Sequence, residues 1–111
     1  MSGKHPTIGQ RRLRVVLEEP VATPDDIGGA TITFAPRVSL WARLEPASVL
    51  DRAEAQRAEG IVTHRLTLRW RGDITGAMRF AAGTRRFAVR GQADPDGRRR
   101  DLVVTVEEVQ P

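Results

Sequence analysis

The sequence predicts a mainly β protein: a small antiparallel β-barrel of about five to six strands, with one long, partly helical loop. Three observations predict this class. Apolar and polar residues alternate along most of the chain, which is the period of a half-buried strand. Turn signals rich in Gly, Asp and Pro separate the alternating segments. The 111 residues are enough for one modest core and no more.

The chain divides into an arm and one domain. Residues 1–10 contain Gly3, Pro6 and Gly9 and have no periodicity, so we expect a flexible N-terminal arm. Residues 11–111 then form a single β-barrel domain that is interrupted by a long loop at 46–60.

The first half of the domain contains two clear strand patterns. The segment RLRVVLEE begins at Arg12 and alternates, and we expect Pro20 and Pro24 to end it because proline cannot donate to a ladder. The motif DDIGG at 25–29 predicts a turn, followed by a short strand. The segment RVSLWARLEP alternates again and places Trp41 on its polar side, where it either covers an end of the barrel or contacts another subunit.

The second half of the domain predicts the remaining strands. The segment IVTHRLTLRWR carries a stripe of Thr and Arg opposite its apolar face, and His64 lies in phase with that apolar face, as a histidine at the edge of the core. ADPDG at 93–97 is a turn signal before the last strand. The residues expected to face the core are Leu66, Leu68, Trp70, Phe87, Val89, Leu102, Val104 and Val106.

The loop at 46–60 is the best candidate for a functional element. It is rich in helix formers, with Ser48 as a helix N-cap and Gly60 as a stop, but its apolar residues are mostly alanine. We therefore expect a long excursion that is helical in part. Its candidate functional residues form a mixed-charge set: Ser48, Asp51, Arg52, Glu54, Arg57 and Glu59.

The residues for catalysis or cofactor binding are missing, and we expect no enzyme, no cofactor and no metal site. The chain has no Cys, and its two histidines, His5 and His64, lie far apart. No serine lies in a nucleophile motif, and Gly28 and Gly29 precede a strand rather than a helix. No segment is apolar enough to span a membrane or to act as a signal peptide, which predicts synthesis in the cytosol.

The formal charge of +4 leaves nucleic-acid binding as the alternative function. Of the 18 basic residues only Lys4 is lysine, and the 17 arginines are interleaved with 14 acids, which favours a solvated, ion-paired sheet face. Small barrels can bind nucleic acid through a basic groove with exposed aromatic side chains. Here the chain offers Arg65, Arg69 and Arg71 for phosphates, but only Trp41 and Phe34 for stacking.

The order of the sequence blocks resembles one known family. The blocks are RLRVVLEEP, DDIGG, VSLWARLEPAS, THRLTLRWR, RGDITGAMRF, TRRFAVRG and DPDGRRRDLVVTVEE, which together cover about Arg11 to Glu108. In this order and spacing they resemble the phage head–tail joining family, whose members are head–tail adaptor and head completion (stopper) proteins. Leu44 stands where the family commonly has a Val-like residue.

The resemblance implies a structural virion protein. Such a connector forms a homo-oligomeric ring, six- or twelve-fold, between the portal-bound adaptor protein and the tail terminator or other tail proteins. It continues the DNA channel and helps to retain DNA, while double-stranded DNA passes without sequence-specific contact. The particle would be a tailed phage, a prophage or a gene transfer agent, assembled in a bacterial host cytoplasm. The loop at 46–60 would point toward the channel or an adjacent subunit.

A ring also implies contacts between subunits. We expect an open edge of the barrel to serve such contacts, together with arginines that meet acidic residues of adjacent subunits more readily than DNA. The candidate ring-interface residues are Trp41, Arg12, Arg14, Arg65 and Arg69.

Overall fold

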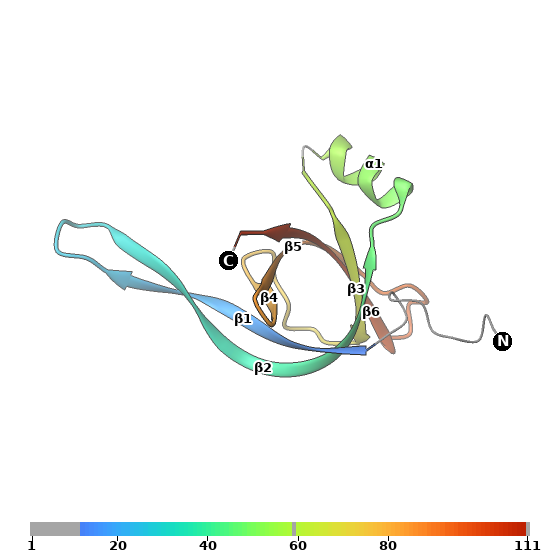
Figure 1. Ribbon diagram of the computed structural model, residues 1–111, viewed down its shortest axis with the longest axis horizontal. Helices are drawn as coiled ribbons and strands as arrows, with labels where there is room; N and C mark the ends of the chain where they lie inside the picture. The colour runs from blue at the N-terminus through green and yellow to red at the C-terminus, as the bar shows by residue number, and fades with distance from the viewer. Residues whose placement is uncertain (1–11, 59, 111) are drawn as a thin grey trace.

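The computed structural model describes residues 12–58 and 60–110, and it confirms a mainly β domain with one short helix (Figure 1). The predicted arm at 1–10 lies outside the described residues. None of the helical structure in the described ranges is long and apolar enough to cross a membrane. The elements in chain order are β1 (Arg12–Pro24), β2 (Ala30–Pro46), α1 (Val49–Arg57), β3 (His64–Arg69), β4 (Arg79–Ala82), β5 (Arg85–Ala93) and β6 (Asp101–Val109).

The six strands form one antiparallel sheet that closes in a ring. The strand order is β1-β2-β3-β6-β5-β4, and β4 returns to pair with β1 through the register Leu17 to Phe80. Closure removes the free edges that an open sheet would have. The expectation of an open barrel edge is therefore wrong for the body of the domain, because the short strand β4 bridges the gap between β5 and β1.

The core fills the inside of this ring. The predicted alternation along the strands is confirmed, since every second residue of a strand points into the core. Ile74 adds a side chain from the connection between β3 and β4, whereas Trp70 is only half-buried and packs against the outside of the cluster. The buried core residues are Val15, Leu17, Ala42, Leu44, Leu66, Leu68, Ile74, Phe80, Phe87, Val89, Leu102, Val104 and Val106.

The expected end of the first strand at Pro20 is wrong. β1 continues through Pro20 to Pro24, and β2 is one strand of 17 residues rather than a short one. Beyond the barrel the two strands form a ribbon that projects far from the body of the domain (Figure 1). In a two-stranded ribbon each strand has one open edge, where a proline needs no donor, so pairing continues past both prolines.

The turn at the end of this ribbon has the predicted chemistry. The Asp25 carboxylate accepts hydrogen bonds from the backbone N–H groups of Ile27 at 3.0 Å and Gly29 at 2.8 Å. The backbone N–H of Asp25 also donates to the Gly29 carbonyl at 3.0 Å, and Gly28 has a φ of +84°, which favours glycine. The turn is thus held locally and presents Asp26 and Ile27 outward.

A β-bulge marks the place where the ribbon leaves the barrel. Leu17 pairs with Val38 and Glu18 pairs with Pro36, so Arg37 is the extra residue on β2. The Arg37 guanidinium lies 3.1 Å from both Glu19 and Asp73, and Asp73 also accepts from Arg71 at 2.9 Å. These ion pairs tie the base of the ribbon to the connection between β3 and β4.

The hydrogen bonds from Arg71, and then from Arg37, lower the pKa of Asp73 to about 2, although partial burial opposes the shift. A carboxylate with a lowered pKa in the folded state stabilises the protein above its unfolded pKa, and that stability is lost as the pH falls toward 2. We expect Asp73→Asn to cost about 1 kcal/mol near pH 7, roughly 4 °C in Tm, and almost nothing near pH 2. Thermal unfolding across this pH range measures the difference, with Asp26→Asn on the exposed turn as the control. A penalty that is the same at every pH would contradict this role for the Asp73 carboxylate.

His64 lies at the edge of the core, as its phase predicts. Its ring meets that of Phe87 edge-on with 5.5 Å between ring centres. Desolvation by partial burial lowers the pKa of His64, although the Glu108 carboxylate acts in the opposite direction. His64 therefore acts as a packing residue, and no cluster of metal-binding side chains is found in the described ranges.

Candidate interaction surfaces

The loop at 46–60 forms a helix that stands away from the barrel (Figure 1). Ser48 is its N-cap, as predicted: its hydroxyl accepts from the Asp51 backbone N–H at 3.0 Å, and the Asp51 carboxylate accepts from the Ser48 N–H at 3.1 Å. The helix ends at Arg57, and the Gly60 N–H donates to the Ala55 carbonyl at 2.8 Å. The side chains of Ser48 and Asp51 thus hold the N-terminal end of the helix, and backbone groups hold its C-terminal end.

The excursion is anchored at its base. The Ala47 N–H donates to the Thr63 carbonyl at 3.0 Å, and Ala47 and Val62 are buried beside the barrel. No residue of α1 is buried, and the apolar side chains of Val49 and Leu50 are exposed. The helix therefore contributes little to the core, and its surface is available to a partner.

A groove separates the helix from the barrel wall. Asp51 lines the groove, and its carboxylate lies 4.0 Å from Arg65 on β3, whose buried Nε has no hydrogen-bond partner among the described residues. Arg90 lines the groove and is paired with Glu107 at 2.7 Å. The groove is lined by Asp51, Glu54, Ala55, Ala58, Gly60, Val62, Arg90 and Thr105.

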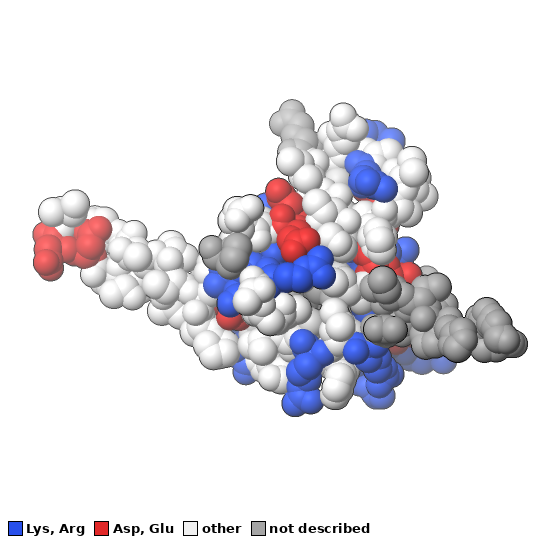
Figure 2. Space-filling model, viewed as in Figure 1, with Lys and Arg blue, Asp and Glu red and all other residues white. Residues whose placement is uncertain are grey.

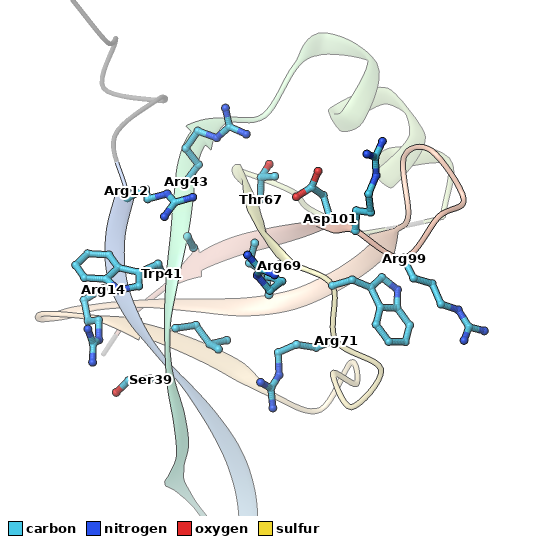
Figure 3. A pocket seen from close by; sticks show the side chains of 15 residues that line it. Arg12, Arg14, Ser39, Trp41, Arg43, Thr67, Arg69, Arg71, Arg99 and Asp101 are labelled. Carbon is cyan, nitrogen blue, oxygen red and sulfur yellow. The ribbon is translucent and has the colours of Figure 1, made fainter.

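A second, larger depression lies where the start of β1 and the end of β3 flank β2. We call it the Arg–Trp surface. It has a floor of Leu40, Ala42 and Leu68, an acid at Asp101, and side chains from four separate parts of the chain (Figure 3). Its arginines and tryptophans are Arg12, Arg14, Trp41, Arg43, Arg69, Trp70, Arg71, Arg99 and Arg100.

Like charges are placed together on the Arg–Trp surface. Arg12 is directly opposite Arg43 in the β1–β2 register, and such pairs destabilise a sheet. Arg14 is opposite Trp41 in the β1–β2 register, and its guanidinium lies 5.1 Å from the centre of the Trp41 ring. The Arg99 guanidinium lies 5.2 Å from the centre of the Trp70 ring. Among the described residues, no ion pair is formed by Arg12, Arg14, Arg43, Arg69 or Arg99.

The arginines on the strands outside this surface have acidic partners. Arg79 on β4 lies 2.6 Å from Glu18, and Arg85 on β5 lies 2.8 Å from Glu108. The space-filling view shows acidic and basic side chains adjacent over the middle of the barrel, and basic ones without acids at its lower rim (Figure 2). The expected ion-paired face is therefore present on one side of the domain. On the Arg–Trp surface Arg71 and Arg100 pair with Asp73 and Asp96, but the other five arginines form no ion pair among the described residues, so this region has an excess of positive charge.

The structure groups most of the predicted interface residues. Trp41, Arg12, Arg14 and Arg69 all line the Arg–Trp surface, whereas Arg65 does not and lies next to Asp51 at the start of α1. In the loop set, Arg52, Glu54 and Arg57 are exposed, Ser48 and Asp51 cap the helix, and Glu59 lies outside the described residues.

Several contributors to the Arg–Trp surface were missed by the interface prediction, for different reasons. Arg43 shares the parity of Trp41 along β2, so the alternation could have indicated it. Trp70 was assigned to the core, although it lies at the end of its strand, where burial is incomplete. Arg99 comes from a turn, and its φ of 58° directs it in a way that no periodicity predicts.

Comparison with known proteins decides the family. A family model described as phage head completion protein matches residues 6–109. This chain belongs to the phage head completion protein family. The resemblance found in the sequence blocks is thereby confirmed, and membership supports a structural role in phage head completion. A search of curated proteins finds no match.

Solved structures share the fold of this head completion protein. The solution structure of protein SF1141 from Shigella flexneri 2a is 27% identical, with a TM-score of 0.71 over 91% of this chain and 95% of that one. A chain from the virion of a native gene transfer agent particle is 24% identical, with a TM-score of 0.57 over 91% of this chain and 98% of that one. At this identity the second likeness concerns the fold alone.

Proposed function

We propose that this head completion protein is a connector that forms a ring between the portal-bound adaptor and the tail of a tailed phage or phage-like particle. The observation that carries the proposal is the match of the family model to residues 6–109, nearly the whole chain. The ring would continue the DNA channel and help to retain the packaged DNA. Its partners would be the adaptor, tail terminator or tail proteins, and further copies of itself, in six- or twelve-fold symmetry.

The geometry is suited to this role. The closed sheet is a rigid body, which a spacer between two assemblies requires. The helix on the loop at 46–60 stands on a narrow base and has no buried residue, so it can adapt to a channel or to a neighbour without unfolding the barrel. A solved structure of the same fold comes from a gene transfer agent virion, which supports a place in such particles.

The test is genetic and structural. In a host that makes the particle, loss of this gene is expected to leave DNA-containing or leaking heads without tails, and supply of the full chain in trans is expected to restore joined particles. Electron microscopy counts the joined particles, and the chain carrying an epitope label should be found at the head–tail junction. Normal tailed particles without the gene would refute the proposal.

The second candidate function is nucleic-acid binding, and the Arg–Trp surface is the observation that favours it. A salt titration of binding to single- and double-stranded DNA discriminates the two functions, because phosphate contacts by several arginines give a steep salt dependence. Sub-micromolar affinity at physiological salt would favour the second candidate. The Arg guanidinium groups above both tryptophan rings oppose it, since they occupy faces on which bases would stack.

A further inference from the structure

We propose that the Arg–Trp surface binds the turn of the β1–β2 ribbon of a neighbouring copy of this chain. The inference rests on the proposed function, since it names the contact that would join subunits in the ring. It rests also on three observations: the charge of the ribbon, its exposed apolar residues, and its distance from the Arg–Trp surface of its own chain.

The charge of the ribbon is complementary to the Arg–Trp surface. From Pro20 to Pro36 the sequence has two acids, Asp25 and Asp26, and no Lys, Arg or His. The acids gather at the far end of the ribbon, where the space-filling view shows them without basic neighbours (Figure 2). Five of the seven arginines of the Arg–Trp surface form no ion pair among the described residues, and Asp101 is its one acid, so each surface lacks the charge that the other supplies.

The apolar residues match as well. Ile27 at the turn is 91% exposed, and Ile32 on the adjoining strand is 57% exposed. Trp41, 54% exposed, offers an apolar face in the Arg–Trp surface, above a floor of aliphatic side chains. An exposed isoleucine that directly follows two acids is suited to an apolar floor rimmed by arginine. The Asp25 hydrogen bonds hold this turn in one conformation before binding, which limits the entropy lost on association.

A chain cannot satisfy its own Arg–Trp surface. Arg12 and Pro24 are the two ends of β1, a strand of 13 residues that reaches roughly 40 Å at about 3.3 Å per residue. Figure 1 shows the ribbon extending away from the barrel end at which β1 begins. The occupant must therefore come from another molecule. A contact between two different surfaces of identical chains is head-to-tail, the arrangement that produces a closed ring when the rotation is suitable.

The absence of cysteine from the chain makes disulfide trapping a direct test. The full-length double variant Asp26→Cys with Ser39→Cys places one thiol on the turn and one on the Arg–Trp surface. Ser39 pairs with Val16, eight residues before Pro24, so the two thiols of one chain are about 26 Å apart along the strand and cannot join. Under mild oxidation at low salt we expect a ladder of linked oligomers that weakens as salt rises.

The matched control pairs Asp26→Cys with Gln56→Cys. Gln56 is exposed on α1, and it is not one of the residues that line the Arg–Trp surface. We expect the Ser39 pair to link at least about tenfold faster than this control. Equal rates for the two pairs, or no linked product from either at millimolar chain concentration, would overturn the proposal.

A charge exchange tests the contact without cysteine. Asp26→Arg and Arg14→Glu are each expected to weaken self-association about five- to tenfold in sedimentation experiments, and the double variant is expected to recover most of the loss. Both positions are exposed, so unchanged Tm values confirm that the variants fold. Additive losses in the double variant would overturn the proposal. It would also be overturned if, at physiological salt, duplex DNA protected the Ser39→Cys thiol and this thiol did not link to the turn.

These outcomes separate the contact from the proposed function. A chain with Asp26→Arg that still restores tailed particles in the genetic test would leave the connector role standing and remove this contact. Failure of the unaltered chain in that genetic test, together with linkage of the Ser39 pair, would retain the contact and remove the connector role.

Discussion

A chain that lacks residues 48–59 is expected to fold normally and yet to give particles that leak DNA or lack tails. The physical reason lies at the base of the excursion, where the Ala47 N–H bonds to the Thr63 carbonyl. The deletion leaves Gly60, Ile61 and Val62 to close a short loop between these two residues, and no buried residue of the helix is lost. The barrel should therefore keep its Tm within a few degrees. Complementation and electron microscopy measure the loss of joined, DNA-containing particles.

A control of equal length separates the loop's shape from its presence. Replacing residues 48–59 with twelve Gly and Ser residues keeps the span but removes the helix and its mixed charges. We expect this variant to fail like the deletion if the helix makes the contacts. Normal infectious particles from the deletion would remove the loop from the mechanism, and an unfolded deletion protein would contradict the assignment of the helix to the outside of the fold.

Phe80→Ala is expected to lower the free energy of unfolding by about 3–5 kcal/mol, a large share of the stability of a domain this size. Phe80 is fully buried on β4 and lies opposite Phe87 in the β4–β5 register. β4 has only four residues and closes the ring against β1, so the cavity would form at the place where the sheet has fewest ladder bonds. Urea unfolding followed by tryptophan fluorescence measures the change.

Trp41→Ala is the matched aromatic control for Phe80→Ala. Because half of the Trp41 side chain is exposed, this variant should lose less than about 1 kcal/mol of stability. We expect its defect to appear in assembly instead, since interface tryptophans contribute disproportionately to binding. A stability loss as large as that of Phe80→Ala would show that Trp41 belongs to the core, and assembly at unchanged levels would remove it from the interface.

The core could be predicted from the sequence because its signal is local. A strand with one buried face alternates with period two, and the predicted inward residues of β3, β5 and β6 are buried, apart from Trp70 at a strand end. The helix in the loop could also be predicted, because the N-cap Ser48 and its capping partner Asp51 lie within one turn of each other. The family resemblance also depends on the order of such local blocks.

Other features depended on partners that are distant in the sequence. Proline ends a strand only where a neighbouring strand requires a hydrogen bond from the backbone N–H that proline lacks. In the ribbon Pro20 pairs with Phe34 on one side and has an open edge on the other, so the strand continues. The sequence predicted a barrel but did not reveal that β4 closes it, because a four-residue strand has too little pattern to indicate its second neighbour.

The sequence alone therefore determined the class of fold, the faces of the strands and the place of the helix, since each follows from spacing within a few residues. Only the tertiary structure decided which arginines meet acids and which stand together with Trp41. That grouping depends on the strand order and register of the sheet, which place the start of β1 and the end of β3 on either side of β2, and the turn before β6 next to the end of β3. The fold also directs the acidic turn of the ribbon away from these arginines. The positive charge of the Arg–Trp surface and the negative charge of the turn are therefore left for another molecule to balance.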